Sequence, residues 1–379
     1  MSYKRKQWNE VLSIVSGKNQ KAVVNPEGQY PIYGSGGIMG YADDYLCEAG
    51  TTIVGRKGTI NNPIFVAERF WNVDTAFGIT PGEELNPKYL YYFCRHFNFK
   101  ALDKSTTIPS LAKRDLLAVE MPVPSLDEQK RIVARIEELF SELDNGVEIL
   151  RKSKQQLAVY RQAVLKDAFS EVSLNEYLPL RTVIVGSPQN GLYKPKSAYG
   201  SGTRILRIDG FYDGKIADDY DFKRLGLSES EIEQYRLNEY DLVVNRVNSM
   251  PYLGKCALVR NLAEVTVYES NMMRMQLDTE KVDPEYVTHY LSSFVGRKEL
   301  TKNAKQAVNQ ASINQTDVGN ALIPIPASLA YQRKVVASIN ARMSVCDSIE
   351  KTVDTTLQQA EAMRQSILKK AFEGNHITK

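Results

Sequence analysis

The chain has 379 residues, of which 43% are apolar and 25% are charged, and its formal net charge is +3 at neutral pH. This length exceeds that of one ordinary domain and predicts two or three. No run of eighteen apolar residues could span a membrane, and no apolar segment follows the charged N-terminus as in a signal peptide. A charge of +3 does not by itself indicate a nucleic-acid partner, so any basic surface must be local.

The cysteines Cys47, Cys94, Cys256 and Cys346 are widely spaced, and there are three scattered histidines. Neither residue type shows the spacing of a zinc site, and no disulfide framework can be read from the positions. We therefore expect no metal, no cofactor held by this chain, and a cytoplasmic location.

The first segment, residues 1–125, reads as a mixed α/β domain. Thr51–Val54 predicts a short strand. Gly34–Gly40 predicts a turn between strands, because it lacks both the G-x-G-x-x-G spacing and the Lys-Ser/Thr of a phosphate-binding loop. Asn86-Pro87 predicts the start of a helix over 88–97, with an N-cap followed by proline at the first helical position. The stretch 86–89 also nearly matches the Asn-Pro-Pro-Tyr loop of amino-methyltransferases, but it lacks the second proline.

A proline-free stretch from Asp127 to Phe169 predicts one long helix, on the order of 60 Å. Gly146, its single glycine, should cost roughly 1 kcal/mol. Acidic and basic residues balance, which is typical of a solvated face. The apolar residues that recur at every seventh position, as in a coiled-coil seam, are Ile136, Leu143, Leu150, Leu157 and Val164.

Residues 173–327 predict a second mixed α/β domain. Leu242–Val244 reads as a strand, and Asp283-Pro284 predicts another capped helix start over 285–294. Tyr199–Gly202 is interpreted as a glycine-containing turn resembling the one in the first half.

The most informative feature is an internal repeat. Arg161–Phe169 matches the segment that begins at Arg364, and Gln129–Ile136 matches the segment that begins at Gln332, both with an offset of 203 positions. Further upstream, 110–115 answers 312–317 with an offset of 202. Before Asn86 and Asp283 the halves diverge. The counterparts of the heptad residues are Ile339, Cys346, Val353, Ala360 and Ile367.

Two long helices of this kind cannot bury their seams alone. The economical arrangement within one chain is that they pack on each other, and either direction is sterically possible. The alternative is that each helix packs on its own globular domain.

Local charge singles out candidate DNA contacts. Arginine and lysine suit guanine edges, asparagine and glutamine suit adenine, and hydroxyls suit phosphates. The alternative is that these loops are simply solvated. The candidates in the first half are Tyr33, Ser35, Arg56, Lys57, Asn61, Asn62, Lys104 and Thr106, and those in the second half are Lys194, Lys196, Arg204, Arg207, Asn245, Arg246, Asn248, Lys302 and Lys305.

Several segments together resemble the specificity subunit of type I restriction–modification systems. The matching segments are 31–37, 55–58, 71–77, 122–133 and 161–169, and the succession of Pro-x-Pro, Gln and long helix occurs twice. The second copy departs from the pattern where Asp127-Glu128 becomes Ala330-Tyr331.

The resemblance implies a pseudo-twofold α/β (mixed α+β) protein with two target recognition domains, 1–125 and 173–327, separated by two long antiparallel coiled-coil helices, 126–172 and 328–379. It implies a non-catalytic subunit that binds double-stranded DNA at a split, asymmetric site. It also implies two modification (methyltransferase) subunits, which use S-adenosylmethionine, together with restriction (motor-nuclease) subunits, and no membrane.

Two other classes of protein remain as alternatives. One is a self-contained methyltransferase or nuclease, which binding of a cofactor by the isolated chain would favour. The other is a coiled-coil scaffold without a nucleic-acid function, which failure to bind any duplex would favour.

Overall fold

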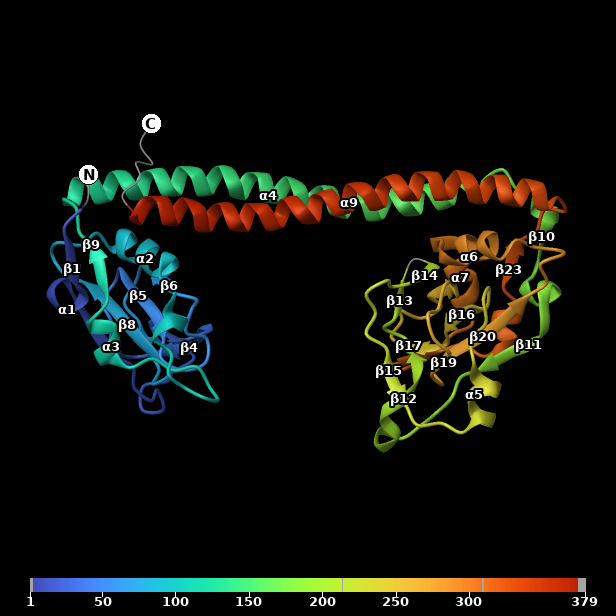
Figure 1. Ribbon diagram of the computed structural model, residues 1–379, viewed down its shortest axis with the longest axis horizontal. Coiled ribbons are helices and arrows are strands. Elements are labelled where there is room, and N and C mark those ends of the chain that lie inside the picture. Colours follow the sequence, from blue (N-terminus) through green and yellow to red (C-terminus); the bar gives the residue numbers. More distant parts are fainter. Residues whose placement is uncertain (1–2, 213, 309, 374–379) are drawn as a thin grey trace. The chain divides into compact units, whose positions relative to one another are not determined.

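The computed structural model describes residues 3–212, 214–308 and 310–373 (Figure 1). The chain divides into two units, of which unit 1 holds Met1–Lys152 and Val353–Lys379 and unit 2 holds Ser153–Thr352. Each unit therefore contains a β-rich domain and part of two long helices, α4 (Leu126–Ala168) and α9 (Leu329–Phe372).

The domain of unit 1, called the first domain below, is built on three small sheets. The first is four-stranded and antiparallel in the order β2-β8-β5-β6, the second has the order β4-β3-β7 with β3 and β7 parallel, and the third pairs β1 with β9. The strands are β1 (Arg5–Gln7), β2 (Leu12–Ser16), β3 (Tyr30–Gly34), β4 (Gly37–Ala42), β5 (Thr51–Gly55), β6 (Ile64–Val66), β7 (Trp71–Asn72), β8 (Ala76–Pro81) and β9 (Glu120–Pro122). The helices are α1 (Trp8–Val11), α2 (Pro87–His96), η1 (Phe99–Leu102) and α3 (Lys113–Leu117).

The domain of unit 2, the second domain, is larger. Its sheets have the orders β11-β20-β16-β18-β14-β13, β15-β12-β19, β17-β22-β21 and β10-β23. The strands are β10 (Tyr177–Pro179), β11 (Ile184–Asn190), β12 (Tyr199–Leu206), β13 (Phe211–Tyr212), β14 (Gly214–Ile216), β15 (Lys223–Leu225), β16 (Leu242–Asn245), β17 (Val247–Asn248), β18 (Cys256–Leu258), β19 (Thr266–Tyr268), β20 (Met272–Leu277), β21 (Lys305–Ala307), β22 (Gln310–Ser312) and β23 (Leu322–Pro324). The helices are η2 (Leu174–Glu176), η3 (Leu180–Val183), η4 (Lys196–Ala198), α5 (Glu229–Tyr235), α6 (Pro284–Ser292), α7 (Phe294–Thr301) and α8 (Gln315–Gly319).

The internal repeat extends through the divergent parts of the two domains. The order β2-β8-β5 in the first domain matches β11-β20-β16 in the second. The parallel pair β3–β7 matches β12–β19, and the edge pair β1–β9 matches β10–β23. The duplication therefore preserved the strand pairing where the side chains had changed.

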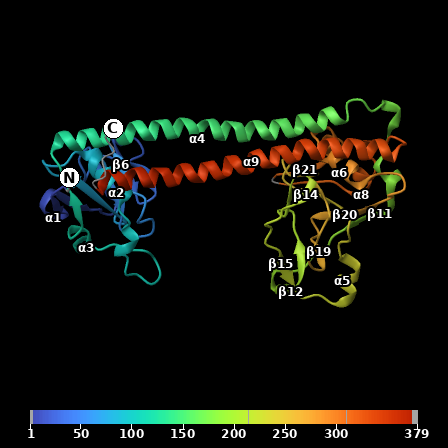
Figure 2. The ribbon, with the colours of Figure 1, turned by 45° about the horizontal axis from the view of Figure 1, so that its top comes forward.

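The long helices α4 and α9 pack together and run antiparallel (Figures 1 and 2). Within unit 1, Arg364 of α9 pairs with Asp144 of α4. Within unit 2, Arg161 of α4 lies 2.7 Å from Asp347 and 3.0 Å from Glu350 of α9. The direction is antiparallel because residue numbers fall along one helix as they rise along the other.

The heptad positions lie on the packed side of these helices. Ile136, Val164, Ile339 and Cys346 are buried, and Leu143 is half-buried. The helices also bury side chains against the domains, since Ile136 belongs to the core of the first domain and Ile339 to that of the second. Packing of helix on helix and of helix on domain therefore coexist.

The helix starts predicted at Asn86 and Asp283 are confirmed as caps. The Asn86 side chain accepts hydrogen bonds from the backbone N–H groups of Lys88 and Tyr89, and Asp283 does the same two and three residues further on. The methyltransferase-like reading of 86–89 is therefore replaced by a capped helix. The turn predicted within Gly34–Gly40 is shorter than expected: Ser35 and Gly36 turn between β3 and β4, whereas Gly34 ends β3 and Gly37–Gly40 belong to β4.

The turn predicted at Tyr199–Gly202 is wrong. These residues lie in β12, where the pairing with β15 shifts register between Tyr199 and Thr203. The positive φ of Gly200 and Gly202 belongs to this strand irregularity and does not reverse the chain.

Cys47, Cys94, Cys256 and Cys346 are buried free thiols. Across the described ranges no group of three or more His, Cys, Asp and Glu side chains is placed to hold a metal ion. Nor does any helix within those ranges have the length and apolar content needed to cross a membrane.

Candidate nucleic-acid interface

In the first domain, the buried strand β5 delivers Arg56 to its carboxyl end. Every residue of β5 is buried, whereas Arg56 is half-buried. Its Nη1 lies 3.4 Å from the carbonyl oxygen of Asp74, and its guanidinium carbon lies 5.8 Å from the centre of the Phe77 ring. The rigid strand therefore fixes the arginine at the rim of the domain.

Three other candidates gather around this end of β5. Lys57 is exposed and forms an antiparallel bridge with Ser110. Ser35, in the β3–β4 turn, lies against Gly55, because a Cβ on Gly55 would come within 3.1 Å of the Ser35 Cβ. The Tyr33 ring packs edge-on against Phe70 with ring centres 5.5 Å apart, and burial raises the pKa of its hydroxyl.

The remaining candidates of the first domain lie on nearby loops. Asn61 accepts a 2.7 Å hydrogen bond from the Phe99 backbone N–H, so its carbonyl oxygen supports the domain. Lys104 pairs with Asp115 at 2.8 Å. Asn62 and Thr106 are exposed.

In the second domain, β16 ends in Asn245 and Arg246 follows directly. Asn245 is fully buried, and its Nδ2 donates to the Ile208 carbonyl oxygen at 3.3 Å. Arg246 is half-buried, and its Nη1 donates to the Ser270 carbonyl oxygen at 2.9 Å. The Oδ1 of Asn245 and the Nε of Arg246 are buried without a hydrogen-bond partner among the described residues.

Arg207 and Asn248 lie close to this strand end. The Nε of Arg207 lies 3.1 Å from Oε2 of Glu269, and Oε1 of Glu269 accepts a 2.7 Å hydrogen bond from the Ile208 backbone N–H. Asn248 lies in β17, and its side-chain oxygen accepts from the Ser249 N–H at 2.8 Å. The structure therefore brings Arg207, Asn245, Arg246 and Asn248 together.

Three further cations of the second domain are paired with carboxylates. Lys194 lies 2.6 Å from Glu231, and this hydrogen bond is the main cause that lowers the Glu231 pKa to about 2. Arg204 pairs with Glu264 at 2.9 Å, and Lys302 pairs with Glu299 at 2.8 Å. Their charge is already partly neutralised within the fold.

Lys196 and Lys305 are exposed, on η4 and β21 respectively, with no ion pair to the described residues. Arg56, Lys57 and Arg246 likewise form no ion pair with the described residues. These five cations have uncompensated charge, which is what a phosphate contact requires.

Sequence reasoning missed the residues that join the helices to the domains. Gln129 in the first turn of α4 is fully buried. Its Oε1 accepts from the Asn86 N–H at 2.7 Å, and its Nε2 donates to the carbonyl oxygens of Glu84 and Pro124 at 2.8 and 2.9 Å. The signal was available, since this glutamine aligns in both halves of the repeat.

Gln332 makes the same contacts at the start of α9. It is fully buried, it accepts from the Asp283 N–H at 2.8 Å, and it donates to the carbonyl oxygens of Lys281 and Pro326 at 3.2 and 2.8 Å. The two glutamines therefore form equivalent joints between helix and domain.

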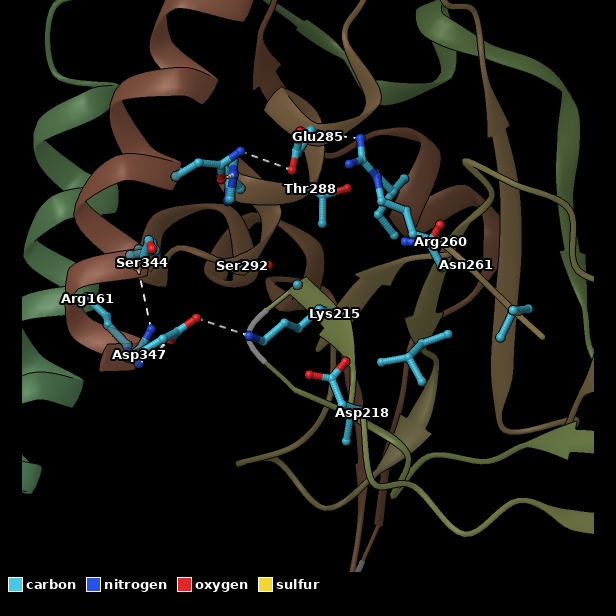
Figure 3. A pocket seen from close by; sticks show the side chains of 18 of the residues that line it. Arg161, Lys215, Asp218, Arg260, Asn261, Glu285, Thr288, Ser292, Ser344 and Asp347 are labelled. Atoms are coloured by element: carbon cyan, nitrogen blue, oxygen red, sulfur yellow. Dashed lines mark hydrogen bonds and ion pairs between the residues drawn. The ribbon is translucent and has the colours of Figure 1, made fainter. Parts of the chain in front are cut away.

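A cavity of about 660 Å³ lies in unit 2 between the long helices and the second domain (Figure 3). On one wall Asp347 accepts from Arg161 and also lies 3.3 Å from Lys215 of the domain. On another wall Arg260 lies 3.4 Å from Glu285. The cavity lining therefore carries charges of both signs, several of them paired with each other.

The equivalent interface in unit 1 is filled by aromatic side chains. Tyr92 and Phe140 pack edge-to-face with ring centres 5.8 Å apart. By the repeat, their counterparts in unit 2 are His289 and Met343, which both line the cavity. The smaller pair leaves space that the aromatic pair occupies.

Residues 2–158 match the family model described as the type I restriction modification DNA specificity domain. The chain is 28% identical to the type I restriction enzyme EcoKI specificity subunit of Escherichia coli K12 over 79% of this chain and 69% of that protein. It is 26% identical to the StySPI specificity subunit of Salmonella potsdam, over 78% of this chain and 67% of that one.

Solved structures share the fold at lower identity. A chain from a study of assembly and conformational transition in a type I restriction–modification system has a TM-score of 0.73 at 16% identity, covering 99% of this chain and 98% of that one. The HsdS subunit of Thermoanaerobacter tengcongensis has a TM-score of 0.53 at 16% identity, covering 99% and 97%. Both match the paired long helices and β-rich domains.

Proposed function

We propose that the two domains of this chain divide the selection of DNA between them. The chain belongs to the family of type I restriction–modification specificity subunits and is the non-catalytic DNA specificity subunit of such a system. The domain of residues 1–125 reads one half of a split, asymmetric DNA sequence, and the domain of residues 173–327 reads the other. Residues 126–172 and 328–373 form the spacer, and the expected continuation of the second range over 374–379 lies outside the described residues.

One observation carries this proposal: the two domains share strand order but differ in the polar residues at equivalent strand ends. After β5 stand Arg56 and Lys57, and after β16 stand Arg246 and Val247. One scaffold with two different polar surfaces suits two different base sequences.

Within the candidate set, we place the DNA contacts first at the cations with uncompensated charge. These are Arg56, Lys57, Lys196, Arg246 and Lys305. We place further base or phosphate contacts at Tyr33, Ser35, Asn62, Thr106 and Asn248. Five cations that are paired with carboxylates would contact DNA only after a phosphate replaces the carboxylate: Lys104, Lys194, Arg204, Arg207 and Lys302. Asn61 and Asn245 hold their loops through hydrogen bonds with the backbone.

The long helices are the docking surface for the partner subunits. They carry exposed large hydrophobic side chains at matching positions of the repeat. Tyr160 is 49% exposed and its counterpart Met363 is 53% exposed, so each helix presents an apolar residue at the same position. Two modification subunits, which use S-adenosylmethionine to methylate adenine, dock here, and restriction subunits join them.

The helical pair also sets the gap between the half-sites. Deleting one heptad from the middle of each helix removes about 10 Å, which corresponds to roughly three base pairs of duplex. Methylation mapping should then find a spacer shorter by that amount. A methylated motif with an unchanged spacer would show that the helices do not determine it.

The proposed function is tested by co-expressing the chain with its modification subunit and mapping methylated adenines across a genome by single-molecule sequencing. A split motif that disappears without this chain supports the proposal. Methylation of the same motif by the modification subunit alone would place specificity elsewhere.

A further inference from the structure

One arginine occupies an equivalent place in the two domains. It follows the strand that is third in the matching orders β2-β8-β5 and β11-β20-β16, so Arg56 directly follows β5 and Arg246 directly follows β16. The two are 190 positions apart, which differs from the offset of 203 in the long helices, and the sequence repeat alone does not align them.

The contacts of Arg56 define the place. Its backbone N–H donates to the Thr75 carbonyl oxygen at 2.8 Å, and its carbonyl oxygen accepts from the Leu111 N–H at 2.9 Å. Its Nη1 lies 3.4 Å from the carbonyl oxygen of Asp74. The arginine thus bridges the residues just before β8 and the loop before α3.

Arg246 makes the same three contacts. Its N–H donates to the Asn271 carbonyl oxygen at 2.9 Å, and its carbonyl oxygen accepts from the Ile313 N–H at 2.9 Å. Its Nη1 donates to the carbonyl oxygen of Ser270 at 2.9 Å. Asn271 directly precedes β20, the counterpart of β8, and Ile313 lies two residues before α8, the counterpart of α3.

The residues around the two arginines differ, although they occupy matching positions. Gly55 before Arg56 corresponds to Asn245 before Arg246, and Lys57 corresponds to Val247. The residue before each arginine contacts the segment just beyond the matching strand, β3 or β12, but the two contacts differ in chemistry. Gly55 lies against Ser35 of the β3–β4 turn, whereas the Nδ2 of Asn245 donates to the carbonyl oxygen of Ile208, just beyond β12.

We propose that Arg56 and Arg246 make the same sequence-independent contact with DNA phosphate in the two half-sites, while the differing residues around them read the bases. This inference rests on the proposed function. An identical side chain held by identical contacts offers the same donors to each half-site, and the feature shared by half-sites of different sequence is the phosphodiester backbone.

The chemistry of the side chain fits this role. The guanidinium is held through Nη1 by a backbone carbonyl oxygen, which fixes its direction and leaves Nη2 for a phosphate, the Nε of Arg246 being buried. Neither arginine forms an ion pair with a carboxylate in the described part of the chain, so its charge is available. A fixed cation of this kind positions each domain on the duplex and leaves discrimination to its neighbours.

The test uses the full-length chain and a duplex library with a randomised segment, from which bound DNA is recovered and sequenced. The selected duplex then serves to measure affinity over a series of salt concentrations. The variants Arg56→Gln and Arg246→Gln keep a side-chain amide that can donate to the carbonyl oxygen while removing the charge. Arg56→Lys and Arg246→Lys keep the charge.

Each Gln variant should select the same motif as the wild type and bind it roughly tenfold more weakly. In each, the negative slope of log affinity against log salt should also become shallower by about 0.9, as loss of one phosphate contact requires. The Lys variants should keep the wild-type slope. Arg69→Gln and Arg236→Gln, which remove exposed arginines paired with Glu48 and Glu233, should change neither quantity.

A Gln variant that loses sequence preference in one half of the motif, or whose affinity and salt slope equal those of the wild type, would overturn the inference and leave the proposed function intact. If the wild type, alone and with its modification subunit, enriches no sequence at all, the proposed function itself fails and this inference with it. Circular dichroism of every variant separates loss of contact from loss of fold.

Discussion

In unit 1 the long helices meet the domain through the aromatic pair Tyr92 and Phe140, whereas in unit 2 the equivalent positions hold His289 and Met343 beside a cavity. The hydrogen-bonded joints next to these positions do not differ: Gln129 and Gln332 make the same three contacts. A joint made of directional hydrogen bonds allows few substitutions, because a change of either partner leaves buried polar groups without a hydrogen bond. A packed apolar interface tolerates replacement at the cost of a void.

The helix ends form a second matched contact between helix and domain, made here by packed aromatic rings. Phe372, at the end of α9, packs against Tyr89 and Phe93 of the first domain with ring centres 5.1 and 5.4 Å apart. Phe169, just after α4, packs against Tyr286 and Tyr290 of the second domain at 5.1 and 5.2 Å. Each domain therefore receives the beginning of one long helix and the end of the other.

The largest expected effect comes from removing these terminal rings. Phe372→Ala should lower the free energy of unfolding of unit 1 by about 3–5 kcal/mol, and Phe169→Ala should lower that of unit 2 by a similar amount, because both rings are buried. Urea denaturation measures both losses. Phe294→Ala, at a ring that is 68% exposed, is the control and should change little. If only one of the two substitutions lowered the free energy of unfolding, the two helix ends would not be equivalent.

Removing the glutamine joints should have the next largest effect. Gln129→Ala and Gln332→Ala each leave one buried N–H and two carbonyl oxygens without their partner, which should cost about 2–3 kcal/mol in the respective unit. Denaturant unfolding of both variants beside Gln358→Ala, an exposed glutamine on α9, gives the comparison. Unequal costs at the two joints would argue against a shared construction.

The His289 site should make unit 2 sensitive to pH. Burial lowers the His289 pKa from its ordinary value of 6.5 against the opposing influence of the Asn340 hydrogen bond and of Glu285 and Asp283, and Arg260 lowers it further. The unfolded chain then binds the proton more readily, so stability is full above pH 6.5 and is lost as pH falls below it. His289→Tyr, which installs the residue found at Tyr92, should reduce this loss. The free energy of unfolding of both proteins is measured at neutral and mildly acidic pH. If both lose the same amount, His289 is not the source of the pH sensitivity.

The smallest effect concerns the middle of the helices. Gly146 in α4 has open space around the position of a Cβ, and its counterpart in α9 is Ile349. Gly146→Ala should raise the free energy of unfolding, measured by thermal denaturation, by about 1 kcal/mol, and Ile349→Gly should lower it by somewhat less. A destabilising Gly146→Ala would indicate that this glycine has a role beyond helix propensity.

Much of the fold could be predicted from the sequence because its signals are local. Proline and cap residues mark the starts of α2 and α6, and the seven-residue period marks α4 and α9. The irregularity at Tyr199–Gly202 was misread because glycine in a strand and glycine in a turn share one local signature.

The candidate site was predicted less completely. Local charge found both Arg56 and Arg246, but their equivalence depends on strand pairing between distant segments and on insertions that change the offset. Local charge also selected Lys194 and Arg204, whose carboxylate partners Glu231 and Glu264 are remote in sequence. Which cations remain uncompensated is a property of the folded chain.

Replacing residues 173–327 with a second copy of residues 1–125 tests whether each domain reads its own half-site. The matched joints at Gln129 and Gln332 and the matched rings of Phe169 and Phe372 should accept the exchange. Adenine methylation mapped with the modification subunit present should then reveal a symmetric motif made of two inverted copies of the first half-site. A motif that keeps the original second half would contradict the account.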